Sequence, residues 1–243
     1  MTPPLFLVPD LGTGSTIVLT GTEAHHAATV KRLAVGEQVL LADGRGGLAE
    51  VVIASVARDR VVCEVRSRTE TAPAEPRFVV VQALPKGERA ELAVEILTEL
   101  GVDEIVPWSA SRSVSLWKGE KAGRGVAKWQ RTAWEAAKQS RRPRVPMVAE
   151  LAGSPQIERR IAAADLAVVL HEDATESLAG VQAPASGEVL LVVGPEGGVS
   201  AEELGRFVAA GARPVRLGSE VLRTSTAGAA ALAVLSVAVG RWR

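Results

Sequence analysis

Three short segments contain the residue types that could bind a ligand or take part in a reaction. They are residues 170–173 (Leu-His-Glu-Asp), residues 194–198 (Gly-Pro-Glu-Gly-Gly) and residues 217–227 (Leu-Gly-Ser-Glu-Val-Leu-Arg-Thr-Ser-Thr-Ala). Three glycines within five residues let the backbone approach a ligand closely, because glycine has no side chain. Glu196 lies inside this glycine-rich segment and would repel a polyphosphate, so an uncharged or cationic ligand is expected. The alternative role of the segment is a plain turn that joins a strand to a helix.

The third segment leads into an apolar stretch, residues 227–239, which is typical of a buried helix. Arg223 lies just before this apolar stretch, and a lone guanidinium next to an apolar element is usually paired or functional. Thr224, Ser225 and Thr226 could cap the helix, and capping is the favoured role for each of them. Arg223 is therefore the candidate for chemistry in this segment.

Several classes of protein are excluded by what the sequence lacks. Neither the dinucleotide fingerprint G-x-G-x-x-G nor the phosphate loop G-x-x-x-x-G-K-[ST] follows an expected strand. Cys63 is the only cysteine, which excludes an internal disulfide and a thiolate-rich metal site and favours a reducing cytoplasm. The histidines, at positions 25, 26 and 171, lack the i, i+4 spacing of a helical zinc pair, so no metal site is expected.

No secretory signal and no membrane span are expected. The first apolar run of the chain has no basic residues before it and is interrupted at Pro9. The most apolar segment, residues 227–239, is shorter than the roughly 20 residues that cross a bilayer.

The formal net charge is zero, but the charge is unevenly distributed. Between Arg112 and Arg144 there are ten basic residues and two acidic ones, a net charge of +8, while residues 1–111 carry −5 and residues 145–243 carry −3. A neutral protein with one strongly basic segment is a candidate for binding a polyanion there. A solvated helix face is the alternative interpretation.

The elements that must position these residues fall into two patterns. In the first seventy residues, short β-rich runs alternate with turns, and Asp43-Gly44 is a hairpin signal between two of them. This pattern predicts a small β-barrel or sandwich with one short helix at 23–33, followed by a polar, proline-bearing linker at 69–76. The expected strands are 17–19, 38–42, 48–57 and 60–65.

After residue 77 the apolar period changes from about 2 to about 3.6, and strands alternate with helices. Ser154 and Pro155 predict the capped start of one helix, and Ser200 with Glu203 forms a capping box at the start of another. This order predicts a largely parallel sheet with helices on both faces, whose ligands bind beyond the carboxyl ends of the strands. The expected strands are 78–84, 104–108, 166–170, 189–193 and 214–217, and the other expected helices are 89–100, 126–140 and 227–239.

A series of motifs, in order along nearly the whole chain, resembles one family. The family is RsmE, the 16S rRNA (uracil-N3)-methyltransferases of the SPOUT class. The motifs of the first part are His25-His26, Arg32-Leu33, Gly36-Glu37 and Asp43-Gly-Arg-Gly46, and those of the second are Gln82-Ala-Leu-Pro-Lys-Gly87, Thr98-Glu-Leu-Gly101, Arg112-Ser-Val114, Glu135-Ala-Ala-Lys-Gln-Ser140, Arg144-Val-Pro146, Gly194-Pro-Glu-Gly-Gly198 and Leu222-Arg-Thr224.

The resemblance implies a PUA-like RNA-binding β-barrel over residues 1–72 and a trefoil-knotted SPOUT methyltransferase domain over residues 73–243. It implies that S-adenosylmethionine is the cofactor and that N3 of one uridine of 16S rRNA in the small ribosomal subunit, U1498 in the usual numbering, is methylated. It also implies a cytoplasmic homodimer that needs neither a membrane nor a metal.

The site residues implied by the resemblance fall into three groups. Arg223 and Glu196 are the expected catalytic residues. The expected cofactor-binding residues are Leu170, His171, Glu172, Gly194, Pro195, Glu196, Gly197, Leu217, Gly218, Leu222, Thr224 and Thr226. The expected RNA-binding residues are His25, Arg32, Arg45, Lys86, Arg112, Lys138, Arg141 and Arg142.

The chain departs from the family pattern at two places. The family commonly opens with an Arg-x-Phe stretch, where this chain reads Pro4-Leu-Phe-Leu-Val8, and its last motif commonly has a glutamate where this chain has Ser225. A serine can cap a helix but cannot act as a carboxylate base. Two alternatives therefore stay open, namely a noncatalytic RNA-binding assembly factor and a SPOUT methyltransferase that acts on another RNA position.

Overall fold

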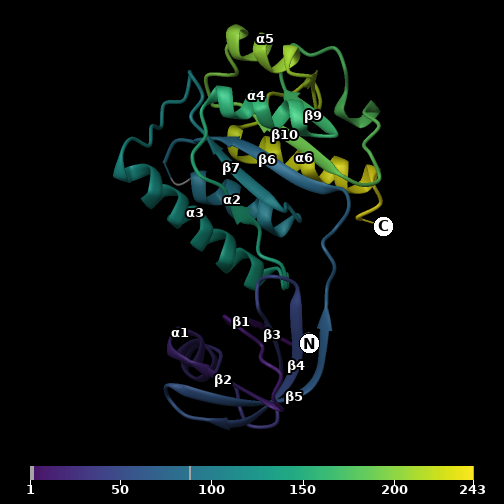
Figure 1. The fold of residues 1–243 in the computed structure, drawn as a ribbon. Coiled ribbons are helices and arrows are strands. Elements are labelled where there is room, and N and C mark those ends of the chain that lie inside the picture. Colours follow the sequence, from purple (N-terminus) through teal and green to yellow (C-terminus); the bar gives the residue numbers. More distant parts are fainter. Residues whose placement is uncertain (1–2, 88, 243) are drawn as a thin grey trace. The chain divides into compact units, whose positions relative to one another are not determined.

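The computed structural model describes residues 3–87 and 89–242, which form two compact units (Figure 1). The first unit comprises Met1–Pro73 together with Ala137–Val145, and the second comprises Ala74–Ala136 together with Pro146–Arg243. Each unit has its own sheet and its own hydrophobic core.

The first unit is built on one mixed, five-stranded sheet in the order β1-β3-β4-β5-β2. The pairs β3·β4, β4·β5 and β2·β5 are antiparallel, as the Asp43-Gly44 hairpin signal predicts for β3 and β4, while β1 and β3 are parallel. Alternate residues along the strands point into the core. The strands are β1 (Leu5–Leu7), β2 (Thr16–Thr20), β3 (Gln38–Ala42), β4 (Gly47–Val56) and β5 (Arg60–Glu70).

The sheet of the first unit is a mixed half-barrel whose edge strands are β1 and β2, in agreement with the predicted barrel-like fold. Two details of the first unit differ from the sequence prediction. Strand β5 continues to Glu70, so the expected linker at 69–76 begins too early. The expected helix 23–33 is a short helix α1 (Gly21–His25) followed by a π-helix η1 (His26–Val30), because the β-branched Thr29 and Val30 do not favour a continued α-helix.

Residues 137–145 lie against the β3–β4 hairpin of the first unit. The backbone N–H of Val145 donates to the Gly44 carbonyl at 2.9 Å, and the backbone N–H of Gly46 donates to the Pro143 carbonyl at 3.1 Å. Arg144 donates from Nε to the Thr71 carbonyl at 2.8 Å. These pairings bring part of the basic segment into the first unit.

The second unit contains a six-stranded, all-parallel sheet in the order β11-β9-β10-β6-β7-β8. Its central strands are buried on both faces, as expected for a parallel sheet covered by helices. The strands are β6 (Arg77–Ala83), β7 (Glu104–Trp108), β8 (Met147–Val148), β9 (Leu166–Leu170), β10 (Glu188–Val193) and β11 (Arg213–Val215).

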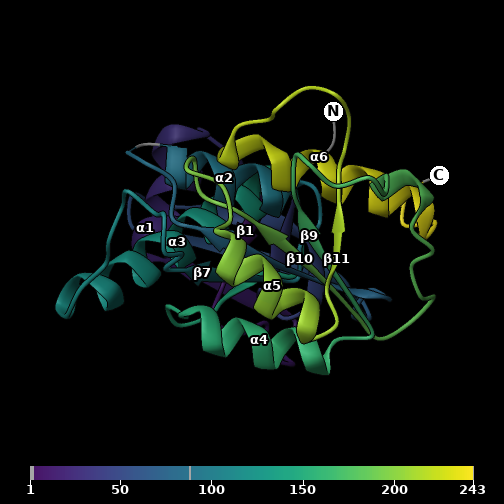
Figure 2. The ribbon, with the colours of Figure 1, turned by 90° about the horizontal axis from the view of Figure 1, so that it is seen from above.

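Helices cover both faces of this sheet, which confirms the predicted layering. Figure 2 shows α2 and α6 on one side of the strands and α4 and α5 on the other. A short 3-10 turn, η2, lies between β9 and β10. The bounds are α2 (Arg89–Glu99), α3 (Glu120–Gln139), α4 (Ser154–Ala163), η2 (Leu178–Gly180), α5 (Ala201–Ala209) and α6 (Thr224–Ala238).

Three helix starts differ from the prediction. Helix α6 begins at Thr224 and not at 227, and its N-cap residue is Arg223. Helix α3 begins at Glu120 and not at 126, because an acidic residue suits the first turn, while Gly123 and Gly125 obscure the helix in the sequence. Ser154 does not cap α4, whose N-cap is Gly153. The Ser154 hydroxyl instead donates to the Glu203 carboxylate at 2.7 Å and accepts from Trp108 Nε1 at 3.2 Å.

Gly228 lets α6 approach the sheet closely. A Cβ at this position would lie 3.2 Å from a methyl group of Val193 and 3.4 Å from one of Leu97. A larger residue would therefore push the start of α6 away from the end of β10. The close approach fixes where the residues before α6 lie. The trefoil knot that the resemblance implies stays a prediction.

Among residues 3–87 and 89–242, no helix is both long and apolar enough to cross a membrane.

Phe207→Ala tests the core that supports α5. Phe207 is fully buried and its ring lies 5.3 Å from that of Trp108, so the cavity should lower the free energy of unfolding by about 3–5 kcal/mol. The neighbouring Val208, which is 45% exposed, offers the control: Val208→Ala should change it by about 0.5 kcal/mol or less. Urea unfolding measures both, and equal losses would contradict this assignment of the core.

Candidate functional site

A pocket of about 730 Å³ opens at the carboxyl ends of β11, β9 and β10. These three strands are neighbours in the sheet, so the segments that follow them come together, as the sequence predicts. The backbone N–H of His171 donates to the Val215 carbonyl at 2.9 Å and joins two of these segments. All three segments singled out in the sequence contribute to the lining.

The pocket gathers all but one of the residues expected to bind the cofactor. Arg223 also lines it, and Arg112, expected to contact RNA, lies there as well. Thr226 is not in the lining, and its hydroxyl donates to the Arg223 carbonyl at 3.2 Å within the first turn of α6. The expected residues that do line it are Leu170, His171, Glu172, Gly194, Pro195, Glu196, Gly197, Leu217, Gly218, Leu222 and Thr224.

The glycine-rich segment is held against Arg112. The Arg112 guanidinium donates from Nη1 to the Gly197 carbonyl at 3.2 Å. A Cβ at Gly197 would lie 3.2 Å from both the Cβ and the carbonyl oxygen of Arg112. Glycine at this position therefore lets two segments far apart in sequence pack backbone against backbone.

Glu196 is exposed and its carboxylate turns to the segment that follows β6. Its Oε1 accepts a hydrogen bond from the backbone N–H of Lys86 at 3.0 Å. This contact gives Glu196 a structural role in ordering two loops. It leaves the second carboxylate oxygen available to a ligand, because no hydrogen bond to that oxygen is found within the described residues.

Arg223 ends the third segment as the N-cap residue of α6. Its carbonyl accepts from the backbone N–H groups of Thr226 and Ala227, both at 2.9 Å, while its side chain is exposed. Ser225 is 5% exposed and points away from solvent. The hydroxyl that replaces the family's glutamate is thus buried at the start of the helix, and the guanidinium is the exposed charge there.

The buried carboxylate of Glu203, 2% exposed, ties three loops around the pocket together. It accepts from the backbone N–H of Ser111 at 2.9 Å and from the hydroxyls of Ser111, Ser154 and Ser200 at 2.7, 2.7 and 2.8 Å. The Ser200 contacts form the predicted capping box of α5. Burial raises the pKa of Glu203, but the hydrogen bonds from Ser111, Ser154 and Ser200 outweigh it and hold the pKa below its usual value.

Two arginines of the lining, Arg89 and Arg216, lie outside the segments singled out in the sequence, while Asp173 and Glu220 lie inside them without being named as expected site residues. The sequence could have predicted Arg89 as a lining residue, because Arg89 begins the helix that follows the expected strand 78–84. Within the described residues the lining holds four guanidinium groups and four carboxylates, so its charges balance. A balanced lining suits a zwitterionic ligand better than a polyanion.

The residues expected to bind RNA lie in both units. Arg141 and Arg142 lie just beyond α3 in the first unit, and Lys138 is buried there in an ion pair with Glu23 at 2.7 Å. Lys86 and Arg112 belong to the second unit. The others, all in the first unit, are His25, Arg32 and Arg45.

The part of the chain that the structure describes contains no group of three His, Cys, Asp or Glu side chains able to hold a metal ion.

Comparison with known proteins places the chain in a family. Residues 72–236 match the RNA methyltransferase domain family, and residues 19–66 match the RNA methyltransferase PUA domain family. The ribosomal RNA small subunit methyltransferase E, RsmE, of Mycobacterium bovis is 44% identical over 100% of this chain and 94% of its own. The chain belongs to the RsmE family. The RsmE of Bacillus subtilis is 32% identical over 91% of this chain and 90% of its own.

Solved structures agree with this membership. An RsmE of Neisseria gonorrhoeae bound to S-adenosyl methionine has a TM-score of 0.85 and 26% identity, covering 97% of this chain and 98% of its own. A methyltransferase of Legionella pneumophila in complex with the cofactor SAM has a TM-score of 0.87 and 29% identity, covering 98% of each chain. The RsmE resemblance seen in the motifs is thereby confirmed, and with it the PUA-like first domain and the parallel-sheet second domain.

Glu203→Gln tests the contribution of the buried Glu203 carboxylate to stability. At pH 7 it should lower the free energy of unfolding by about 2 kcal/mol, because hydrogen bonds to a charged acceptor become weaker or are lost. Since the folded pKa is lowered, the stabilisation is present above the unfolded value, about 4.3, and is lost as pH falls through the folded pKa. The difference from the unaltered chain should therefore shrink in acid.

Urea unfolding between pH 7 and pH 3 measures this difference. Glu202→Gln is the matched control, because Glu202 is the exposed neighbour on the same turn and should change stability by about 0.5 kcal/mol or less. A stability difference for Glu203→Gln that stays constant across this pH range would show that the carboxylate charge is not what the serines stabilise.

Proposed function

We propose that this protein transfers the methyl group of S-adenosylmethionine to N3 of a uridine of 16S rRNA, U1498 in the usual numbering. The observation that carries the proposal is the pocket at the strand ends of an RsmE-family chain. Eleven of the twelve residues expected to bind the cofactor line it. The activity named for the relatives and the residues found in this pocket point to the same chemistry.

The pocket fits S-adenosylmethionine in shape and charge. Its volume of about 730 Å³ lies within the usual range of roughly 300–1,000 Å³ for small-molecule sites. Leu170, Leu217 and Leu222 offer apolar surface to an adenine ring. The glycines at 194 and 197 let the segment that borders the pocket pack tightly, since a Cβ at Gly194 would lie 2.8 Å from Val199 and one at Gly197 would lie 3.2 Å from Arg112. The lining holds carboxylates that can face the ammonium and sulfonium groups of this ligand and guanidinium groups that can face its carboxylate.

S-Adenosylmethionine, when bound, supplies an electrophilic methyl group. The chain must then make N3 of uracil nucleophilic, because this nitrogen carries a proton in the neutral base. For N3 to bond to this methyl group, its N–H proton would have to pass to an acceptor, either the Glu196 carboxylate or water, while the methyl–sulfur bond breaks. The site must therefore stabilise negative charge that develops on the uracil oxygens.

Arg223 is our assignment for this stabilising charge. Its guanidinium is exposed at the pocket and follows directly on Leu222, while its backbone is fixed as the N-cap of α6. The N-terminus of α6 adds a partial positive charge at the same place. Glu196 is the second catalytic candidate, either as proton acceptor or as the residue that orders the glycine-rich segment through Lys86.

The net positive charge of residues 112–144 supports RNA as the substrate of this protein. We assign RNA contacts to the exposed basic residues of this segment and to those of the PUA-like domain, including Arg32 and Arg45. The expected RNA contact of Lys138 is withdrawn, because Lys138 is buried in its ion pair with Glu23. The functional division that we propose is an RNA-binding domain over 1–72 and a methyltransferase domain over 73–243. The finer assignments, a homodimer that acts in the cytoplasm on small ribosomal subunits, follow from the family resemblance.

The test is methyl transfer from labelled S-adenosylmethionine to small ribosomal subunits that lack their own base methylations, with naked 16S rRNA alongside. Digestion and nucleoside analysis should yield labelled 3-methyluridine. Label on a ribose or another base would contradict the assigned position. Cofactor binding without any transfer would favour the noncatalytic assembly factor, in which Ser225 marks the lost chemistry.

Arg223→Ala tests the charge at the reacting base. We expect kcat to fall about 100-fold, because removal of one preorganised donor to a developing anion typically costs this much. Binding of S-adenosylmethionine, measured by calorimetry, should change little. Arg223→Lys should recover part of the rate, since it retains the charge but not the planar fork.

Arg159→Ala is the matched control, because Arg159 is an exposed arginine of α4 outside the pocket lining. It should leave kcat unchanged. Near-normal turnover by a folded Arg223→Ala variant would remove Arg223 from the mechanism.

A further inference from the structure

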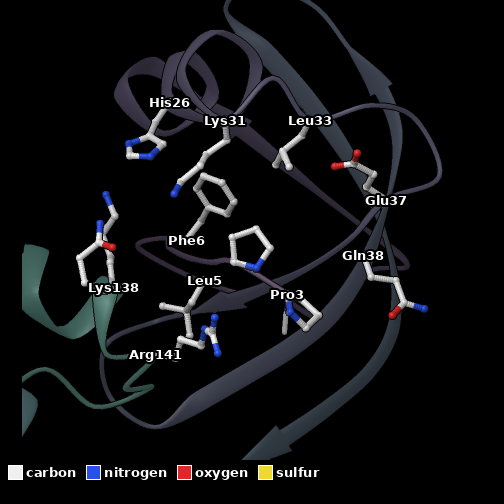
Figure 3. A pocket seen from close by; sticks show the side chains of 12 residues that line it. Pro3, Leu5, Phe6, His26, Lys31, Leu33, Glu37, Gln38, Lys138 and Arg141 are labelled. Carbon is white, nitrogen blue, oxygen red and sulfur yellow. The ribbon is translucent and has the colours of Figure 1, made fainter. Parts of the chain in front are cut away.

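A second pocket, of about 690 Å³, lies wholly within the first unit (Figure 3). It is bordered by the residues before and within β1, by the π-helix η1 and the turn that follows it, and by the end of α3. None of the cofactor residues lies in this unit. A ligand in this pocket would therefore be distinct from the cofactor.

The pocket has an apolar floor and walls. Phe6 and Leu5 are almost fully buried beneath it, and Pro4 and Leu33 are partly exposed at its sides. The His26 ring stands perpendicular to the Phe6 ring, with 5.9 Å between centroids, which fixes the orientation of a partly exposed imidazole. Such a surface can stack a flat ring.

Charge is distributed unevenly around this apolar surface. Lys31 and Arg141 are exposed at the pocket, and neither forms an ion pair within the residues that the structure describes. Lys138 is already paired with Glu23 and forms a fixed part of the wall. Two uncompensated cations next to apolar surface favour an anionic ligand that also carries an apolar part.

The polar groups suitable for a base edge lie apart from Arg141. Figure 3 shows Glu37 and Gln38 at the opposite side of the pocket from Lys138 and Arg141. A carboxylate and an amide can pair with the N–H groups and carbonyls of a nucleobase. A phosphate would be repelled by Glu37 and attracted by Arg141, so the lining favours one orientation of a nucleotide.

We propose that this pocket binds one unpaired nucleotide of the substrate RNA, at a position other than the methylated uridine. Its base lies against His26 and the apolar walls, and its phosphate lies near Lys31 and Arg141. A duplex would not enter, because its bases are stacked inward and only its backbone is presented. The inference rests on the proposed function, which supplies RNA as the substrate, and names a separate contact that selects it.

The experiment separates charge from shape in the full-length protein. Lys31→Gln with Arg141→Gln removes the two cations. Gln139→Trp fills the pocket with no change of charge, since Gln139 is an exposed residue of its lining. Arg58→Gln removes an exposed charge of the same unit outside the pocket and serves as control. Melting curves establish that each variant is folded.

Filter binding to naked 16S rRNA at several salt concentrations gives the affinity and its salt dependence. The double variant should bind at least about tenfold more weakly and show a slope shallower by about 0.7, because one single-strand phosphate contact contributes roughly this much to the slope. Gln139→Trp should lose a similar affinity with an unchanged slope. In methyl transfer, both should raise KM while kcat and cofactor affinity stay within about twofold, as expected for uniform binding.

Three results would overturn the proposal. Unchanged RNA affinity of Gln139→Trp would mean that the cations act on the surface and no base enters. Unchanged affinity of the double variant would remove the phosphate contact. Weaker binding to small subunits but not to naked rRNA would assign the pocket to a ribosomal protein. If the unaltered chain transfers no methyl group, the proposed function fails, while the RNA affinities still decide the pocket.

Discussion

The architecture of the cofactor pocket depends on one buried carboxylate. Removing an ionised glutamate from water costs several kcal/mol unless hydrogen bonds replace the lost hydration. Glu203 receives these hydrogen bonds from one backbone N–H and three serine hydroxyls. The serines come from the loop after β7, from the start of α4 and from the loop before α5. The need to satisfy one charge thus holds three separate parts of the chain in place.

These hydrogen bonds matter because the glycine-rich segment has few side chains that could fix its own conformation. Three of its five residues have no side chain, so they have no side-chain groups with which to anchor the segment. Its position is set instead from its two ends and its neighbours. Ser200 is tied to Glu203 just beyond the segment, and Arg112 donates to the Gly197 carbonyl from a loop that Ser111 ties to the same carboxylate. The backbone of the glycine-rich segment is therefore held in place by two charged residues outside the segment, Arg112 and Glu203.

The sequence predicts those parts of the site that depend on local pattern. The capping box between Ser200 and Glu203 is visible because its members are three residues apart, and the convergence of the loops follows from the order of parallel strands. The contacts of Glu203 with Ser111 and Ser154 span 92 and 49 residues and leave no periodic signal. This is why Ser154 is read as a helix cap in the sequence, although its hydroxyl serves the buried carboxylate.

Contacts between residues far apart in the sequence also escape prediction in the first unit. Strand β1 is only three residues long, and its parallel pairing with β3 has no turn that would reveal it. The return of 137–145 to the β3–β4 hairpin depends on backbone hydrogen bonds, which any residue type can make. The pocket of this unit arises from these two non-local features together. Its basic residues are visible in the sequence, but their gathering around Phe6 is not.

The distribution of charge between the two pockets follows from the chemistry that each must perform. A methyl donor with a sulfonium group is repelled by a strongly basic site, while RNA binding requires uncompensated positive charge. The cofactor pocket has balanced charges, and uncompensated cations line the pocket of the first unit. Each pocket thus has the charge that suits the ligand proposed for it.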